Sequence, residues 1–563
     1  MFTRRRFGSL ALIVLAIGLS LSVAAQGGRT TPPAGARGVK TIASFDMRSP
    51  MRFLSAKEFR GRSAPSWELD IASRYLALEA ERIGLKTLMP DGSYFQQLPV
   101  EVTTMSSTRS HLRISGPGGD TLVPFPQGFA ANVRTGGEWA AAGALVFAGS
   151  ALGAGAPTWD DRIDVRGRFV VVLEEAAPAP GAAAPGAGNA AARTRLLREK
   201  GAIGMVTVIS PEREDNMAAQ GFSFDVAERL RFLDVDTVNP APAPPPSRPA
   251  GLPPTAAAAP PQAPFYTVEV RHAVAATMLG ITPEQVRALF AALAARQTVS
   301  ARAIDGRSLD VAVMFDQRRR TTPNVVAYLP GSDPLLRNEY VVIGSHHDHN
   351  PVREGRIFPG ADDNASGCIA MLAIAKAMMV ERPKRSVIFV WHTAEERGLV
   401  GAYYFVQHAP VPVEKITANL NLDMLTRNDP NSIYVIGLNK ISSELDRSFK
   451  AAAPAANLAL DYKYEDPGEP SRFFFRSDHY PYMRYGIPGV WVFCGTTPDY
   501  HTERDVEERV DYVKMEKATR LTYLVAMDVG NRPALLPLDV HPEIASRGAH
   551  NMKVVWQRPA PAR

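Results

Sequence analysis

From Thr321 onward, short apolar strands alternate with helices, and this alternation restricts the possible fold more than any other feature. Strands are expected at 324–330, 340–346, 386–392, 418–424, 432–437 and 489–495, and helices at 366–380, 398–409, 440–453, 477–486 and 510–530. Strands that are apolar along their whole length and alternate with helices predict a sheet covered on both faces. We therefore expect an α/β fold in which a mostly parallel mixed sheet is flanked by helices.

Histidines and carboxylates gather at the ends of these expected strands, where parallel sheets place their sites. The segments that carry them are GSHHDHN (344–350), GADDNASG (360–367), WHTAEERG (391–398), NLDM (421–424) and PDYHTERD (498–505). Imidazoles and carboxylates together form the donor set of a divalent metal. In the last segment, Asp505 lies near enough to His501 to support it. Each segment alone also fits a polar loop that caps a helix. Five of them in chain order favour a metal site.

The first segment contains a spacing typical of a metal-bound histidine. His346 ends an expected strand and Asp348 lies two residues later, on the same side of an extended chain. This spacing lets the carboxylate hold the imidazole and fix its tautomer. His347 points to the opposite face and His349 lies in the following loop, so neither is expected to bind a metal.

Together, the motifs HxD (346–348), GADDNASG, AEERGLVGA (394–402), NLDM and DYHTERD (499–505) resemble the M28 family of co-catalytic zinc peptidases, of the bacterial aminopeptidase type. The resemblance covers residues 321–530. It implies a zinc-exopeptidase fold of the phosphorylase/hydrolase-like kind and two zinc ions per chain. It also implies an enzyme that removes N-terminal residues from peptide or protein substrates, and a cis peptide bond at Asp363–Asn364.

The resemblance also assigns roles to individual residues. Asp363 would bridge the two zinc ions, with His346 and Asp423 completing one metal site and Glu396 and His501 the other. Glu395 would be the general base and acid for a water shared by the metals, and Asp348 would orient His346. Tyr500, Phe475 and Tyr480 are candidates for substrate binding, and aromatic core packing is the alternative for this run.

Other functions on the same fold stay open. A carboxypeptidase or dipeptidase would need a basic group for a substrate carboxylate, for which Arg427 and Arg476 are candidates. A metal-free, receptor-like binding protein would lack ligands, and a glutaminyl-cyclase-like enzyme would use a single zinc. The complete five-ligand set argues against the last two.

Composition divides the rest of the chain. Residues 46–124 resemble the N-terminal part of the peptidase domain, and 276–535 would complete it. Between them, 125–275 resembles an inserted protease-associated domain, with Pro/Ala-rich loops at 177–191 and 239–264. A linker at 26–45 and a C-terminal tail at 536–563 flank these parts.

The N-terminus indicates export. Residues 1–25 combine three arginines, an apolar run and a small-residue cleavage pattern, which is typical of a signal peptide. We expect a periplasmic or extracellular protein, exported by the Sec or the twin-arginine route, with no stable membrane insertion after cleavage. Removal of Arg4, Arg5 and Arg6 would lower the net charge from +6 to +3, so no nucleic-acid partner is expected. The oligomeric state does not follow from the sequence.

The chain has two cysteines, Cys368 and Cys494, each inside an apolar run. Two cysteines cannot form a disulfide framework, and we expect both to be buried thiols.

Overall fold

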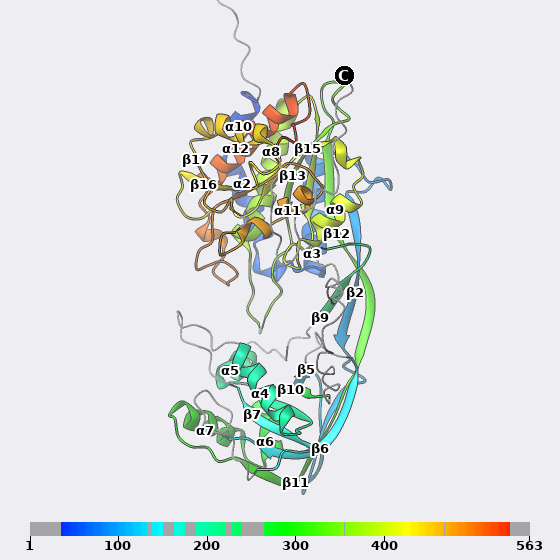
Figure 1. The fold of residues 1–563 in the computed structure, drawn as a ribbon, viewed down its shortest axis with the longest axis vertical. Helices are drawn as coiled ribbons and strands as arrows, with labels where there is room; N and C mark the ends of the chain where they lie inside the picture. Colours follow the sequence, from blue (N-terminus) through cyan, green and yellow to red (C-terminus); the bar gives the residue numbers. More distant parts are fainter. Residues whose placement is uncertain are drawn as a thin grey trace, which may run out of the picture.

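The computed structural model describes residues 35–131, 137–149, 163–174, 187–219, 224, 228–237, 264–353, 355–466 and 468–540. The described chain forms two bodies, each built on one sheet, stacked along the long axis of the molecule (Figure 1). The expected signal peptide, the linker up to residue 34 and the Pro/Ala-rich stretch 239–263 lie outside the described residues.

The larger sheet has ten strands: β1 (Lys86–Thr87), β2 (Phe95–Met105), β9 (Glu228–Phe232), β12 (Phe315–Leu329), β13 (Tyr340–His346), β14 (Ser386–His392), β15 (Ile416–Leu422), β16 (Ser432–Ile436), β17 (Ala459–Asp461) and β18 (Gly489–Phe493). They follow the order β17-β16-β18-β15-β13-β14-β12-β2-β9, with β1 also paired to β12. The four central strands, β18, β15, β13 and β14, are parallel to one another, and antiparallel pairs flank them. The α/β fold with a mixed, helix-flanked sheet is as expected.

Helices cover both faces of this sheet. One face packs against α2 (Ser44–Leu54), α3 (Trp67–Ile83), α8 (Gly367–Val380), α10 (Ser443–Ala452) and α12 (Tyr512–Asn531), and the other against α9 (Val400–Gln407) and α11 (His479–Arg484). Along β13, Val341 and Ile343 belong to the first core and Val342 to the second. The strand is apolar throughout because successive side chains enter opposite cores.

Side-chain caps start two helices of the larger body, α3 and α12, and a glycine ends α3. Ser66 accepts a hydrogen bond from the Leu69 N–H at the start of α3, and Gly84, with φ of +97°, ends this helix. Asp511 accepts from the N–H groups of Val513 and Lys514 at the start of α12. Such caps satisfy N–H groups that have no partner within the helix.

Among the described residues, one helical stretch, Ala361–Val380, is long and apolar enough to cross a membrane. This stretch contains α8, and 78% of its most apolar window is buried inside the protein. Its hydrophobicity is therefore explained by packing against β13 and its neighbours. The two cysteines lie nearby, and both are free and buried.

The smaller sheet has eight strands: β3 (His111–Gly116), β4 (Gly119–Val123), β5 (Phe129–Ala131), β6 (Trp139–Phe147), β7 (Arg168–Leu173), β8 (Gly204–Val208), β10 (Tyr266–Val270) and β11 (Arg302–Val313). Their order is β4-β3-β11-β6-β7-β8-β10-β5. The helices of this body are α4 (Ala187–Glu199), α5 (Pro211–Ala219), α6 (His272–Leu279) and α7 (Pro283–Ala294).

Strands on both sides of 125–275 thus join the smaller sheet, which is a wider span than composition suggested. The low-complexity sequence at 177–191 and 239–264 indicated where this body begins to differ from the peptidase part. β3, β4 and β11 have an ordinary strand composition, so composition did not separate them from the peptidase part. The resemblance of 125–275 to a protease-associated domain stays a prediction.

A two-stranded ribbon joins the bodies. β2 and β12 pair without interruption from Phe95↔Val325 to Met105↔Phe315, beyond which the chain enters the smaller sheet. Val325 is also paired with Trp391, near the carboxyl end of β14. The ribbon therefore continues past the carboxyl edge of the central strands (Figure 1). β9 returns from the smaller body to pair with β2, which adds a second attachment.

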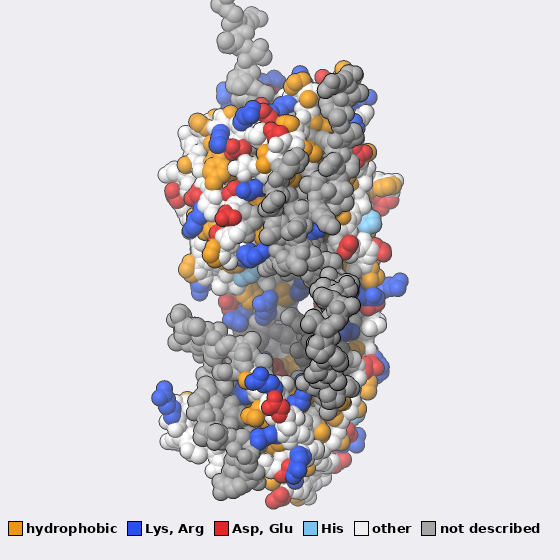
Figure 2. Space-filling model, in the orientation of Figure 1, with side chains coloured by type: hydrophobic (Ala, Val, Ile, Leu, Met, Phe, Trp, Pro, Cys, Tyr) orange, Lys and Arg blue, Asp and Glu red, His pale blue; other side chains and the backbone are white. Residues whose placement is uncertain are grey.

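Acidic and basic side chains are interspersed over the described surface of the face drawn in Figure 2. This distribution follows the nearly balanced composition of 63 Lys and Arg against 57 Asp and Glu. That the protein has no nucleic-acid partner stays a prediction.

The central strands should dominate stability. Leu420→Ala in β15 removes a side chain that is 0% exposed, so we expect a loss of about 2–5 kcal/mol in the free energy of unfolding, measured by urea denaturation. The matched control is Leu335→Ala, whose side chain is 87% exposed and should change stability by less than ~0.5 kcal/mol. Equal losses in the two variants would contradict the assignment of β15 to the core.

Candidate metal centre

The carboxyl ends of the central parallel strands bring the predicted residues together. His346 is the last residue of β13, Asp423 follows β15 directly, and Glu395 follows β14 by three residues. Asp363 comes from the tight helical turn Ala361–Ser366 that leads into α8, and His501 from the loop after β18. The expected cis peptide bond is present at Asp363–Asn364.

Asp363 lies between two groups of side chains and offers one carboxylate oxygen to each. Its Oδ1 is 3.3 Å from His346 Nε2, which is also 3.2 Å from Asp423 Oδ1. Its Oδ2 is 3.0 Å from His501 Nε2, which is equally close to Glu396 Oε1. In each group the possible ligand atoms all lie within 4.8 Å of one another. This is the arrangement that a bridging carboxylate has between two metal ions.

The tautomer of His346 suits a metal ligand. Its Nδ1 lies 3.0 Å from the main-chain carbonyl oxygen of Asp348 and donates to it, which leaves Nε2 facing Asp363 and Asp423. The sequence predicted that the Asp348 carboxylate would hold this ring, but that oxygen is 3.8 Å away. The carboxylate instead accepts from the N–H groups of Glu395 and Glu396, at 3.0 and 3.4 Å. An extended chain brings the carbonyl of residue i+2, rather than its side chain, to the imidazole.

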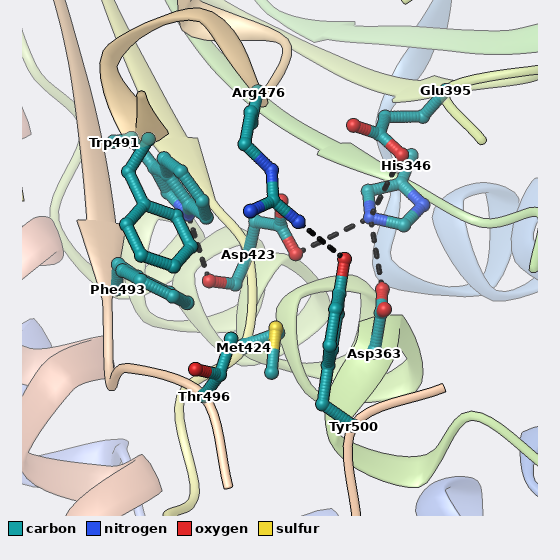
Figure 3. A pocket seen from close by; sticks show the side chains of 11 residues that line it. His346, Asp363, Glu395, Asp423, Met424, Arg476, Trp491, Phe493, Thr496 and Tyr500 are labelled. Carbon is teal, nitrogen blue, oxygen red and sulfur yellow. Dashed lines mark hydrogen bonds and ion pairs between the residues drawn. The ribbon is translucent and has the colours of Figure 1, made fainter. Parts of the chain in front are cut away.

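Glu395 lies on the open side of the first group. Its Oε2 is 3.9 Å from His346 Nε2, and its side chain lines the pocket described below (Figure 3). Burial, together with the charges of Glu396 and Asp423, raises the pKa of Glu395 well above the usual value for a glutamate. A carboxyl group that readily holds a proton in this position is suited to general acid and base chemistry.

Electrostatics favour positive charge at both groups. Burial opposes protonation of His346, but Asp423 and Glu395 outweigh it and raise the pKa of His346 well above its usual value. In the same way, Asp363 and Glu396 overcome burial and raise the pKa of His501 to about 10. A divalent cation could take the place of these protons.

The donor chemistry also fits zinc. His501 Nε2 is buried and has no hydrogen-bonding partner of suitable geometry, although two carboxylate oxygens lie 3.0 Å away. Ligands that share an ion at ~2.0–2.1 Å lie about 3 Å or more apart, so these separations match neighbouring positions around one metal. The described residues therefore could hold two ions, one in each group.

A buried ion pair behind the metal centre holds the turn that carries Asp363. The Asp505 carboxylate accepts from the main-chain N–H groups of Asp362 and Asp363 at 3.0 Å and pairs with Arg427 at 2.7 Å. The sequence suggested that Asp505 would support His501 and that Arg427 could bind substrate. In the structure, Asp505 and Arg427 instead hold the turn that carries Asp363. Arg427 is only 7% exposed.

A small pocket opens beside Glu395 and Asp423. The space between its walls is about 270 Å³, including the part that is open to solvent. Its apolar wall comprises Met424, Phe473, Trp491 and Phe493, and its polar wall Arg476, Thr496 and Tyr500 (Figure 3). Arg476 Nη2 donates to the Tyr500 hydroxyl at 3.1 Å.

Of the three candidate substrate-binding residues, only Tyr500 lines this pocket. Phe475 and Tyr480 are 3% and 4% exposed and pack edge to face against each other in the core, with ring centroids 5.1 Å apart. Phe473, from the same aromatic run, does line the pocket. Neighbours in a single helical turn point in different directions, and the sequence alone did not show which one faced the site.

The sequence reasoning also missed His349. It was placed in a loop, away from the metals, yet its Nδ1 lies 2.9 Å from Glu396 Oε1. The signal was present in the third histidine of the GSHHDHN segment, but a loop has no periodicity that predicts which way a side chain points.

Comparison with known proteins finds similarity over part of this chain. Residues 324–526 match the sequence profile of peptidase family M28. The chain is 36% identical over 196 residues to a probable leucine aminopeptidase 2 of Aspergillus oryzae, covering 33% of this chain and 36% of the relative. It is 31% identical, with the same coverage, to leucine aminopeptidase 2 of Trichophyton equinum. The chain thus matches about a third of the length of these curated relatives.

The solved structures that are similar to this chain include an aminopeptidase from Aneurinibacillus sp. strain AM-1, at 18% identity and a TM-score of 0.46, covering 90% of this chain and 98% of that one. A zinc aminopeptidase from Bacillus subtilis is similar at 16% identity and a TM-score of 0.46, covering 89% and 99%.

The Asp505–Arg427 pair should be essential to the turn. Asp505→Asn leaves the buried Arg427 guanidinium without its counter-charge, so we expect a loss of about 3–5 kcal/mol in unfolding free energy, measured by urea denaturation of metal-free protein. The control is Asp499→Asn, because Asp499 pairs with two largely exposed arginines, Arg504 and Arg509, and should cost under ~1 kcal/mol. If the two variants lose the same stability, the pair does not hold the turn.

Proposed function

We propose that this chain is a metallopeptidase that uses two zinc ions to remove N-terminal residues from peptides. The observation that carries this proposal is the position of Asp363, with one carboxylate oxygen toward each of two groups of imidazoles and carboxylates. The match of residues 324–526 to peptidase family M28 and the similarity to leucine aminopeptidases support the reaction type.

Charge balance supports a pair of divalent ions. Four carboxylates, those of Asp363, Glu395, Glu396 and Asp423, share a largely buried site with imidazoles, which bind a metal in their neutral form. Burying several like charges without compensation is costly. Two divalent cations would neutralise all four negative charges.

In this proposal His346, Asp363 and Asp423 hold the first zinc ion, and Asp363, Glu396 and His501 hold the second. When bound, the two ions would lower the pKa of a water molecule between them and polarise the carbonyl of the scissile bond. Asp348 would fix the ligand orientation, through its carbonyl at His346 and through its carboxylate at the turn that carries Glu395 and Glu396.

Glu395 would move the proton. Its carboxylate is positioned to take a proton from the attacking water and to return it to the leaving amine, so it ends the cycle in its starting state. Tyr500 would assist at the carbonyl oxygen. A guanidinium can only donate, so the Tyr500 oxygen accepts from Arg476 and keeps its own hydrogen free to donate into the pocket.

The acidic lining favours a substrate with a free amine. His346, Asp363, Glu395 and Asp423 surround the inner end of the pocket, where negative charge would attract the α-ammonium group of a peptide N-terminus. The apolar wall of Met424, Trp491 and Phe493 would then hold the first side chain.

One observation favours a second candidate function, cleavage of substrates that carry a nearby carboxylate, as in a carboxypeptidase or dipeptidase. Arg476 lines the pocket and makes no ion pair with any carboxylate of the described residues. A guanidinium that has no carboxylate partner within the protein is suited to binding the carboxylate of a substrate. Arg427, the other candidate, is already paired with Asp505. A receptor-like protein without catalysis is less favoured, because both metal groups and the adjacent glutamate are complete.

The test is a panel of substrates assayed with and without a chelator. We expect cleavage of aminoacyl substrates with a free amine, no cleavage of N-acetylated peptides, loss of activity on complete metal removal, and recovery on addition of zinc. Activity that persists without metal would overturn the proposal. Cleavage of N-acetylated peptides from the carboxyl end would favour the second function, and Arg476→Met should then raise KM for substrates with a free carboxylate but not for amidated ones.

A second experiment tests the role of Glu395. Glu395→Gln removes the proton acceptor without removing a ligand, so we expect zinc content to stay at the wild-type level while kcat falls by about 10²–10⁴-fold. Zinc is measured by elemental analysis and kcat by steady-state kinetics. Glu503→Gln is the control, since Glu503 is exposed and close to His501 in the chain but outside the pocket. A Glu395→Gln enzyme with turnover close to that of the control would rule out this base.

Export to the periplasm or the extracellular space stays part of the proposal. Its support is the pattern of residues 1–25 alone, which lie outside the described residues.

A further inference from the structure

His349 is a buried histidine whose ring nitrogens have no hydrogen bond. It lies three residues after β13 and is 1% exposed. Neither Nδ1 nor Nε2 has a hydrogen-bonding partner of suitable geometry. Buried polar atoms are nearly always satisfied, so an orphaned imidazole next to a metal centre indicates a missing partner.

Its neighbour His347 shows that burial alone is not the cause. His347 is also 1% exposed, but its Nε2 lies 2.8 Å from Ser73 Oγ and its Nδ1 2.8 Å from the carbonyl oxygen of His392. Two histidines that are two residues apart are thus equally buried, and only His349 lacks hydrogen-bonding partners. The difference lies in what the ring of His349 faces.

The ring of His349 faces the second metal group. Its Nδ1 is 2.9 Å from Glu396 Oε1 and 3.7 Å from Asp363 Oδ2, and its ring centroid is 5.4 Å from that of His501. The four side chains place one possible ligand atom each within 4.8 Å of all the others. These separations are in the range expected for neighbouring ligands around one ion at ~2.0–2.1 Å.

A hydrogen bond to Glu396 does not explain this contact. The distance is short, but a hydrogen on Nδ1 would not point at the carboxylate oxygen. That oxygen already accepts from Asn350 Nδ2 at 3.1 Å. If the Nδ1 lone pair and the carboxylate oxygen both point at one cation, the two atoms lie close together without the alignment that a hydrogen bond needs.

The surrounding chain holds the ring in this position. The His349 N–H donates to the carbonyl of Arg62 at 3.3 Å, and Arg62 in turn donates to the carbonyls of His347 and Gly360. Gly360 has φ of +62°, and a Cβ there would lie 2.8 Å from His349 Cδ2 and 2.3 Å from the Asp363 carbonyl oxygen. Only glycine allows the loop to approach the imidazole so closely.

We propose that His349 is an additional ligand of the second metal ion, which makes that site His349, Asp363, Glu396 and His501. The inference rests on the proposed metal centre and adds a fourth protein ligand to one side of it. The first site keeps three protein ligands, His346, Asp363 and Asp423. Sites with four protein ligands are typically structural, whereas three ligands leave a position open for water or substrate. The second ion is therefore the one held more tightly, and the first is the one that exchanges.

The unmodified protein allows a direct test. Zinc-edge X-ray absorption on protein loaded with two zinc ions counts imidazole ligands. Three histidines shared by two ions predict about 1.5 imidazoles per zinc, whereas the five-ligand set without His349 predicts about 1.0. A count near 1.0 overturns the inference without any variant. Failure of the wild-type protein to bind two ions would instead overturn the proposed function.

Variants test the asymmetry by zinc titration of metal-free protein. His349→Gln should weaken the tighter of the two sites by ~100-fold or more. Asn350→Ala is the matched control, since it removes a hydrogen bond to the same Glu396 oxygen without removing a ligand, and should weaken binding by only ~10-fold. Equal effects of the two variants, or an unchanged tight site in His349→Gln, would show that His349 only supports Glu396.

Discussion

The accumulation of buried negative charge at one edge of the larger sheet is the constraint on which the rest of the structure depends. Asp363, Glu395, Glu396 and Asp423 are brought together because four parallel strands end side by side. Such a cluster can persist only if its backbone is held rigidly and its charge is compensated. The first requirement explains why a fully buried arginine, Arg62, and a buried ion pair, Asp505 with Arg427, anchor the loops behind it. The second explains why His346, His349 and His501 each face a carboxylate. The buried polar groups that hold the loops and the candidate metal ligands on those loops therefore depend on one another.

The larger sheet could be predicted from the sequence because its central strands have no polar face. β13 and β14 were predicted with their observed bounds, since helices cover both sides and leave a continuous apolar run that ends where the strand ends. The smaller body was harder to delimit. β3, β4 and β11 are half-exposed strands with polar residues, and their membership of the second sheet depends on long-range pairing that no local pattern records.

The candidate site was predictable to the extent that strand ends define it. His346, Glu395 and Asp423 follow from the rule that parallel sheets place functional residues beyond their carboxyl ends. Loop residues do not follow from any period. His349 was assigned away from the metals and lies beside Glu396, and Asp505 supports the turn of Asp363 rather than His501. Phe475 and Tyr480 face the core although Phe473, in the same turn, faces the pocket. Side-chain direction in these segments is set by tertiary packing.

The ribbon of β2 and β12 limits the distance between the smaller body and the candidate metal centre. Val325 is level with the carboxyl ends of the central strands, and β12 extends ten residues beyond it, to Phe315, before the smaller sheet begins. The smaller body therefore stands on the same side of the larger sheet as the metal centre, at most about 34 Å of strand away. The ribbon is a spacer of fixed length, stiffened by β9. For the proposed peptidase, this length would set the clearance that a chain end has when it approaches Glu395.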